Sequence, residues 1–182
     1  TKTTQLYPND FRAYNNLGEL AFAAGDAAKA ESYFKQAASK NANAPEVNAN
    51  LGLCELVKGN VAAAESYLGK ATGANAANEA LGNLYIKQGQ YDRAVNAFGD
   101  AKTNSAAQAQ ILAKDYNKAK ATLSAIKNPD AMTDYLMAIV GARTNNASLV
   151  SSSIKSAIAK DASMAQRAAN ARVFAKIAES IK

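Results

Sequence analysis

The 182-residue chain has no histidine, no tryptophan, one cysteine and three prolines. The lack of histidine removes the commonest general base and the commonest metal ligand of proteins. Because Cys54 is the only cysteine, the chain cannot form an internal disulfide, and cysteine usage does not identify a compartment. Without a histidine to activate it, Cys54 in the segment LGLCEL is predicted to be a packed helical thiol.

Long apolar runs are also missing. The longest covers residues 135–142, far short of the roughly 20 residues that a helix needs to span a bilayer. We therefore expect no direct membrane insertion. Aromatic residues make up only 7% of the chain, and much of its 48% apolar content is alanine. This composition supports a continuous core built from close contacts between helices.

The net charge of +6 is uneven along the chain. Residues 1–100 carry nine Lys/Arg and ten Asp/Glu, whereas residues 101–182 carry twelve and five. Such an excess could attract nucleic acid, but these charges are interspersed with Ala, Ser and Asn and are not clustered with aromatics. We interpret them as solvated surface and predict no nucleic-acid partner.

One helical pattern is written more than once. NLGELAFAAGDAAKAESYFKQA at 16–37 returns as NLGLCELVKGNVAAAESYLGKA at 50–71, and Leu-Gly pairs recur 34 and then 30 residues apart. Later landmarks keep the same register in all three copies. They are a turn glycine, an alanine, a large apolar residue and a closing alanine: Gly25, Ala30, Phe34 and Ala37; Gly59, Ala64, Leu68 and Ala71; Gly89, Ala94, Phe98 and Ala101.

Each copy is typical of two amphipathic helices joined by a short turn. Gly18, Gly52 and Gly82 lie inside the first helix, where glycine costs roughly 1 kcal/mol relative to alanine. A neighbouring helix packed closely against each position would compensate for this cost. The turn glycines are expected to end the first helix in the left-handed conformation.

This spacing resembles the tetratricopeptide repeat over residues 11–102. Tyr14 and Tyr85 fit aromatic positions of that motif. Four residues depart from it, and we expect these departures to loosen local packing: Ala21, Asn48, Glu55 and Asn78. The resemblance implies an all-α fold, a right-handed superhelical solenoid of antiparallel helix pairs with about five units and a C-terminal capping helix.

The pattern weakens beyond Lys102, where the Leu-Gly pair is missing. Pro8 falls in the closing proline position of a repeat, so we expect the parent chain to continue upstream. Phe174, Ile177 and Ile181 would lie on one face of a final helix. The expected organisation is a truncated repeat tail at 1–10, three clear repeats at 11–44, 45–74 and 75–102, two degenerate helix pairs at 103–161, and a capping helix at 162–182.

No constellation for catalysis is visible. The sequence has no P-loop, no GxGxxG and no cluster of metal ligands. The carboxylates are dispersed through the expected helices. We therefore predict that the protein is not an enzyme and uses no cofactor and no metal.

Stacked helix pairs present their first helices on a concave face. The residues predicted to bind a partner there are Arg12, Asn15, Asn16, Glu19, Glu46, Asn50, Glu79, Asn83 and Lys87, with Phe22, Leu53, Val57 and Ile86 projecting beside them. Asn16 and Asn50 occupy equivalent positions. The resemblance implies that an asparagine there hydrogen-bonds a peptide backbone. Alternatively, it bridges adjacent repeats, and both readings stay open.

The favoured function is a non-catalytic scaffold that binds a peptide or protein segment in its concave groove. The alternative is a spacer or assembly domain of a larger bacterial cell-envelope protein. The sequence does not identify the partner. It also leaves the compartment open between the bacterial envelope or periplasm and the cytoplasm.

Overall fold

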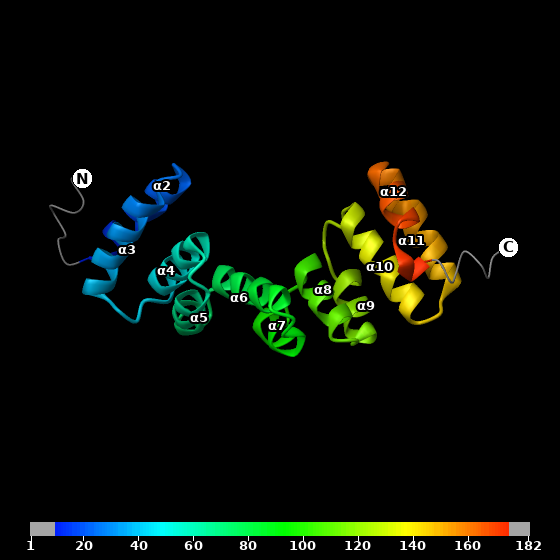
Figure 1. Cartoon of the computed structure of the whole chain (residues 1–182), viewed down its shortest axis with the longest axis horizontal. Coiled ribbons are helices and arrows are strands. Elements are labelled where there is room, and N and C mark those ends of the chain that lie inside the picture. The colour runs from blue at the N-terminus through cyan, green and yellow to red at the C-terminus, as the bar shows by residue number, and fades with distance from the viewer. Residues whose placement is uncertain (1–9, 175–182) are drawn as a thin grey trace. The chain divides into compact units, whose positions relative to one another are not determined.

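The structure, a computed structural model, describes residues 10–174, and every regular element within that range is a helix (Figure 1). The chain divides between Leu84 and Tyr85 into two compact units. The helices are α2 (Phe11–Ala23), α3 (Ala27–Lys40), α4 (Pro45–Lys58), α5 (Val61–Lys70), α6 (Asn75–Lys87), α7 (Tyr91–Phe98), α8 (Asn104–Leu112), α9 (Tyr116–Ser124), α10 (Ala131–Arg143), α11 (Ala147–Lys160) and α12 (Ser163–Ala169). The predicted all-α fold of helix pairs is confirmed.

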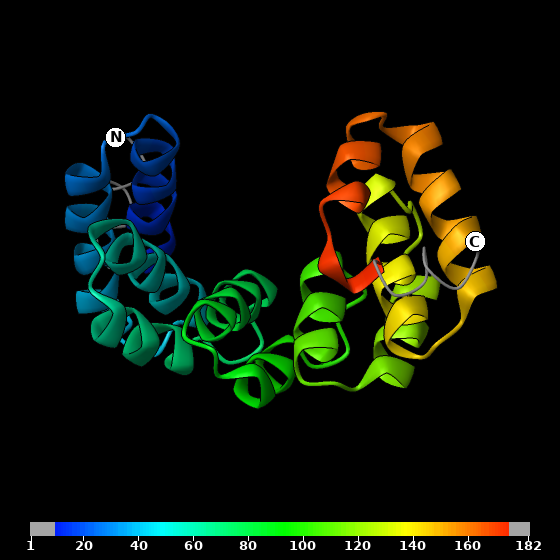
Figure 2. The ribbon, with the colours of Figure 1, turned by 45° about the vertical axis from the view of Figure 1, so that its right-hand side comes forward.

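In the first unit, α2 lies against α3 and α4 lies against α5, so that each pair forms an antiparallel hairpin (Figures 1 and 2). Local signals set the ends of these helices. The Asp10 and Asp26 side chains accept hydrogen bonds from the backbone N–H of Arg12 and Lys29, which caps α2 and α3. Pro45 begins α4, where its missing N–H costs nothing.

Two glycines inside the first helices allow these hairpins to close. A Cβ at Gly18 would lie 2.4 Å from Phe34 Cε1, and one at Gly52 would lie 2.6 Å from Leu68 Cγ. The neighbouring helix expected at both positions is therefore present. The turn glycines Gly25, Gly59 and Gly89 all have positive φ, as predicted.

Two of the departures from the repeat pattern do not loosen the packing. Asn48 is buried, and its Nδ2 donates to the backbone oxygens of Ala42 and Ala44 at 2.9 and 3.0 Å. The amide thus holds the turn that precedes α4. The expectation of looser packing is wrong here because the buried side-chain amide finds its hydrogen-bond partners in backbone oxygens of the turn.

Glu55 is also buried, at 7% exposure, and is stabilised by its neighbours. Lys58 Nζ lies 2.5 Å from Glu55 Oε1, and Asn60 Nδ2 donates to Oε2 at 2.8 Å. Lys58 also pairs with Glu31 on α3 at 3.1 Å, which links the two hairpins. Hydrogen bonds from Lys58 and Asn60 hold the pKa of Glu55 below its usual value.

The second unit contains α7, the hairpins α8–α9 and α10–α11, and α12 (Figure 2). The hairpins α8–α9 and α10–α11 keep the register of the first unit, but other residues stand at the positions of its turn glycine and of Gly18. Lys114 and Asn145 have φ of 65° and 56° and take the place of the turn glycines. Seven residues before each stands a buried alanine, Ala107 or Ala138, in the position of Gly18.

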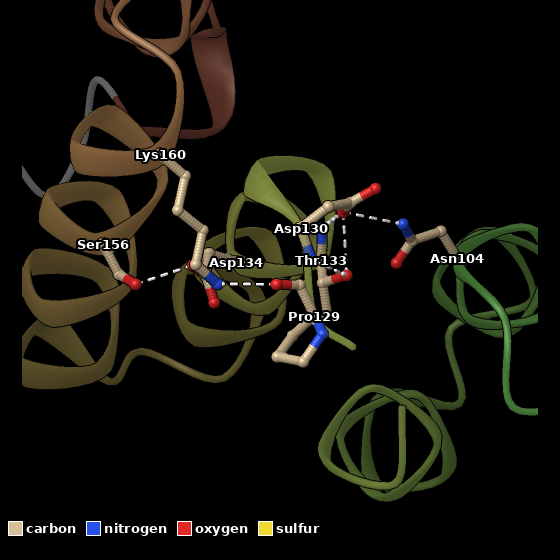
Figure 3. Close-up of polar contacts among 7 residues, drawn as sticks. All are labelled: Asn104, Pro129, Asp130, Thr133, Asp134, Ser156 and Lys160. Atoms are coloured by element: carbon tan, nitrogen blue, oxygen red, sulfur yellow. Dashed lines mark hydrogen bonds and ion pairs between the residues drawn. The ribbon is translucent and has the colours of Figure 1, made fainter. Parts of the chain in front are cut away.

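The start of α10 is fixed by a capping box, drawn in Figure 3. Asp130 Oδ1 accepts from the Thr133 backbone N–H at 2.8 Å, and Thr133 Oγ1 accepts from the Asp130 backbone N–H at 3.2 Å. The Thr133 backbone N–H is the main cause that lowers the pKa of Asp130. Asn104 Nδ2 donates to the same Asp130 oxygen at 3.0 Å, which joins α8 to the start of α10.

A second polar group joins α11 to α10 (Figure 3). Asp134 Oδ2 accepts from Ser156 Oγ at 2.6 Å and lies 2.8 Å from Lys160 Nζ. Lys160 Nζ also donates to the Pro129 backbone oxygen at 2.9 Å. The hairpin is therefore closed by charge-assisted hydrogen bonds in addition to its apolar contacts.

The chain end differs from the predicted single capping helix over 162–182. Helix α12 ends at Ala169, with Asn170 as its C-cap, and the chain turns before Phe174. This turn allows the buried Phe174 ring to meet Tyr135 edge-on at 5.8 Å between centroids. Arg167 and Arg172 are exposed. Ile177, Ile181 and residues 1–9 of the expected tail lie outside the described residues.

No described helix combines the length and the apolar character that crossing a bilayer requires.

Candidate functional site

A cavity of about 190 Å³ opens between α2 and α4 in the first unit. Phe22, Phe34 and Leu53 supply most of its apolar wall, while Glu19 and Asn50 supply its polar groups. We call it the α2–α4 cavity; Ala23 also lines it. Four of its residues come from the sequence prediction, whereas Phe34 was named only as the large apolar landmark of the first repeat.

Hydrogen bonds between the first two repeats organise the polar side of this cavity. Asn50 Nδ2 donates to Asn15 Oδ1 at 2.9 Å and to Glu19 Oε1 at 3.2 Å. Asn15 Nδ2 donates to the same Glu19 oxygen at 2.8 Å. The Asn50 amide nitrogen therefore bridges α2 and α4, which is one of the two roles weighed for it.

Two acceptors of this group remain available to a ligand. Among the residues that the structure describes, no donor is bonded to Glu19 Oε2 or to Asn50 Oδ1. Glu19 is exposed and Asn50 is half-buried, so both oxygens belong to side chains that solvent can reach. The arrangement can accept N–H donors beside an apolar cavity, as an extended peptide segment requires.

The other predicted residues do not line the α2–α4 cavity. Arg12 forms an ion pair with Asp10 at 2.9 Å, next to the N-terminus of its own helix. Asn16 is exposed and takes no part in the Asn50 hydrogen bonds. Five further residues lie elsewhere on their helices: Glu46, Val57, Glu79 and Lys87 are exposed, and Asn83 is half-buried.

Sequence reasoning missed a larger cavity, of about 450 Å³, in the second unit. Its apolar lining comes from α8, α10 and the segment after α12: Ile111, Leu112, Met132, Leu136, Ile139 and Val173. Its polar lining consists of Asn104, Ser105, Gln108, Tyr135, Arg143 and Arg167. We call it the α8–α10 cavity. The sequence offers only one clue to it, the pair Tyr135 and Arg143 on one helix.

The family is decided by the sequence of the repeats themselves. Profiles described as tetratricopeptide repeat match residues 21–84 and residues 76–106. Residues 21–106 are tetratricopeptide repeats. Comparison of the sequence with curated proteins gives no match. Proteins with this repeat generally act as interaction scaffolds without catalysis of their own.

Solved structures agree with this family fold. PilW, described as a widely conserved type IV pilus biogenesis factor, has a TM-score of 0.66 at 21% identity, covering 87% of this chain and 81% of its own. Pseudomonas aeruginosa PilF has a TM-score of 0.72 at 13% identity, covering 86% of this chain and 79% of its own. YrrB, described as having an unusual peptide-binding site, has a TM-score of 0.70 at 18% identity, covering 93% and 97%. At these identities the likeness extends to the fold alone.

The one thiol of these tetratricopeptide repeats is buried in the core of the first unit, as predicted. Burial, followed by the nearby charge of Glu31, raises the pKa of Cys54 to about 11. The thiol is therefore protonated at neutral pH. Within residues 10–174, no three His, Cys, Asp or Glu side chains gather in a way that could hold a metal ion.

Proposed function

We propose that this tetratricopeptide repeat protein is a scaffold that binds a peptide or protein segment at the α2–α4 cavity. The observation that carries the proposal is the pairing of an apolar cavity with two available acceptors, Glu19 Oε2 and Asn50 Oδ1. An apolar side chain of the segment would enter between Phe22 and Leu53. Its backbone N–H groups would donate to the two oxygens.

The size of the cavity supports a side chain as its occupant. Its volume of about 190 Å³ is below the roughly 300–1,000 Å³ of typical small-molecule sites. A single contact of this size gives modest affinity, so further contacts along the first helices would have to contribute. The described peptide-binding site of YrrB, which has the same fold, favours the same class of ligand.

The hydrogen bonds between repeats give the site its preorganisation. Because Asn50 Nδ2 is already bonded to Asn15 and Glu19, the side chains need not be ordered when a segment binds. In this proposal the bridging role and the binding role of Asn50 belong to different atoms. The nitrogen bridges the repeats, and the oxygen accepts from the ligand.

A displayed library of linear peptides, selected on the full chain, provides the test. A fluorescent copy of the selected peptide is then titrated with the parental chain and with Leu53→Lys, which places a charge in the apolar wall. We expect at least about tenfold weaker binding. Leu20→Lys is the matched control, because Leu20 is 69% exposed on α2 and does not line the cavity.

Glu19→Gln provides a second variant, which keeps one oxygen for the Asn15 and Asn50 donors and replaces the available acceptor by an amide NH2 group. It should weaken the same peptide severalfold while circular dichroism and the melting temperature stay close to parental. Equal affinity for the parental chain, Leu53→Lys and Glu19→Gln would refute the site. A library that yields no specific peptide would also count against the proposal.

A further inference from the structure

The α8–α10 cavity of the second unit has a chemistry of its own. Its floor is apolar, with Leu136 buried and Ile111 and Ile139 half-buried on facing helices. Its volume of about 450 Å³ leaves room for more than one side chain. Ser105 and Gln108 follow α8 and offer neutral donors and acceptors to a peptide backbone, while the Asn104 amide is already bonded to Asp130.

Among the described residues of its lining, two arginines supply the only charges, and none is Asp or Glu. The Arg167 guanidinium carbon lies 5.1 Å from the centroid of the Tyr135 ring. Tyr135 is itself buried and held edge-on by Phe174. A guanidinium that packs on an aromatic face keeps its N–H edge free for a carboxylate. Arg167 is therefore partly oriented before any ligand arrives.

Neither arginine is neutralised by a carboxylate among the described residues. Within residues 10–174, no carboxylate forms an ion pair with Arg143 or Arg167. The surrounding unit is basic as well, since residues 85–182 carry fourteen Lys/Arg and seven Asp/Glu. Such a field attracts anionic partners and favours carboxylates at this cavity.

We propose that the α8–α10 cavity binds an acidic peptide segment that carries both apolar side chains and carboxylates. The apolar side chains would cover Ile111, Leu136 and Ile139, and the carboxylates would pair with Arg143 and Arg167. This inference rests on the proposed function only in treating the chain as a scaffold. The two cavities share no residue, so either can fail in its test without the other.

The test uses the full chain with methyl-labelled isoleucine and the peptide acetyl-GSLEDLLESG-amide as the probe. Methyl NMR titration should shift Ile111 and Ile139 first. The variant Arg143→Gln/Arg167→Gln should bind about tenfold more weakly, because it loses the charge-assisted contacts. Lys118→Gln/Lys155→Gln removes two charges from exposed positions of the same unit outside the cavity, and should bind within about twofold of parental.

Two altered peptides separate the contributions of the ligand without changing the protein. Replacing its Glu and Asp by Gln and Asn, or its Leu by Ser, should each weaken binding about tenfold. Equal binding by the two double variants, shifts confined to other isoleucines, or no binding of the probe would overturn the proposal. So would a single-stranded oligonucleotide or an anionic lipid vesicle that displaces the peptide and binds more tightly.

Discussion

The two cavities of this chain are built alike and charged differently. Each has an apolar wall that includes side chains from the first helices of neighbouring hairpins. In the first unit the polar group is the Glu19 carboxylate, held by two asparagines, whereas the second unit presents Arg143 and Arg167. The same repeat geometry can therefore hold a cavity lined by a carboxylate or by arginines, because a few helix positions decide the charge of the lining.

The hairpins also close in different ways. In the first unit a glycine faces a large side chain, as Gly18 faces Phe34. In the second unit the equivalent position is a buried alanine, Ala138, and near the turn Gly141 faces Val150. The small residue at each close helix contact thus differs between the two hairpins, and the side chain packed against it fills the remaining volume. Four predictions test this comparison.

The largest effect is expected from adding a methyl group where the first unit has no space. Gly52→Ala puts a Cβ 2.6 Å from Leu68 Cγ, so it should destabilise the protein by about 1–3 kcal/mol despite the better helix propensity of alanine. Gly69→Ala is the matched control, because no atom lies within 4 Å of its added Cβ. It should stabilise by about 0.5–1 kcal/mol. Urea unfolding measures both, and a stabilising Gly52→Ala would contradict the packing described.

The next effect compares Glu55 with Gln110, which stand at equivalent positions four residues before the left-handed turn residue. Glu55 is paired, whereas Gln110 Oε1 is buried without a partner within the described residues. Gln110→Met should therefore stabilise by about 1 kcal/mol. Glu55→Met removes the carboxylate that pairs with Lys58 and should destabilise by about 1 kcal/mol. The cost stays this small because Lys58 is partly exposed and keeps its ion pair with Glu31. Urea unfolding that gives both variants the same sign would refute this contrast.

A dependence on pH follows from the same ion pairs. Hydrogen bonds from lysines hold the folded-state pKa values of Glu31 and Glu55 below their usual value of 4.5. Their contribution to stability is therefore present above about pH 4.5 and is lost as the pH falls through the lower folded-state values. The difference in urea midpoint between the parental chain and Glu55→Gln should shrink from pH 7 to pH 3. A difference that stays constant would argue against the ion pair.

The smallest effect concerns the turn residues that replace glycine in the second unit. Lys114→Gly should stabilise by about 0.5–1 kcal/mol, because Lys114 has φ of 65°. Asn145→Gly should gain less, since asparagine tolerates the left-handed region better than lysine. Thermal unfolding of the two variants gives the order. Equal or reversed gains would show that the turns are not limited by backbone strain.

The sequence predicted the helix pairs of the first unit because its special residues are glycines with one physical reason each. Gly18 and Gly52 predict close helix contacts, and Gly25 and Gly59 predict left-handed turns. The sequence also predicted that Glu19 and Asn50 lie on the same face, because both belong to the concave side of the first helices. It did not foresee the burial of Glu55, because the Lys58 and Glu31 contacts depend on tertiary packing.

The second unit was harder to predict because glycines do not mark its close helix contacts and turns in the same positions. Alanine, lysine and asparagine perform the roles of glycine there, and each of these residue types is common in other settings. The α8–α10 cavity depends on Arg167 and Phe174 meeting Tyr135 more than 30 residues away along the chain. Helix periodicity within one segment carries no information about such contacts.

The claim that the chain is a peptide-binding scaffold is tested most directly by methyl NMR of the full chain with the library-selected peptide. We expect the Leu53 methyl groups to shift and to show NOEs to an apolar side chain of the peptide. Shifts confined to the exposed Leu20, Val57 and Val61, with Leu53 unchanged at saturation, would contradict it.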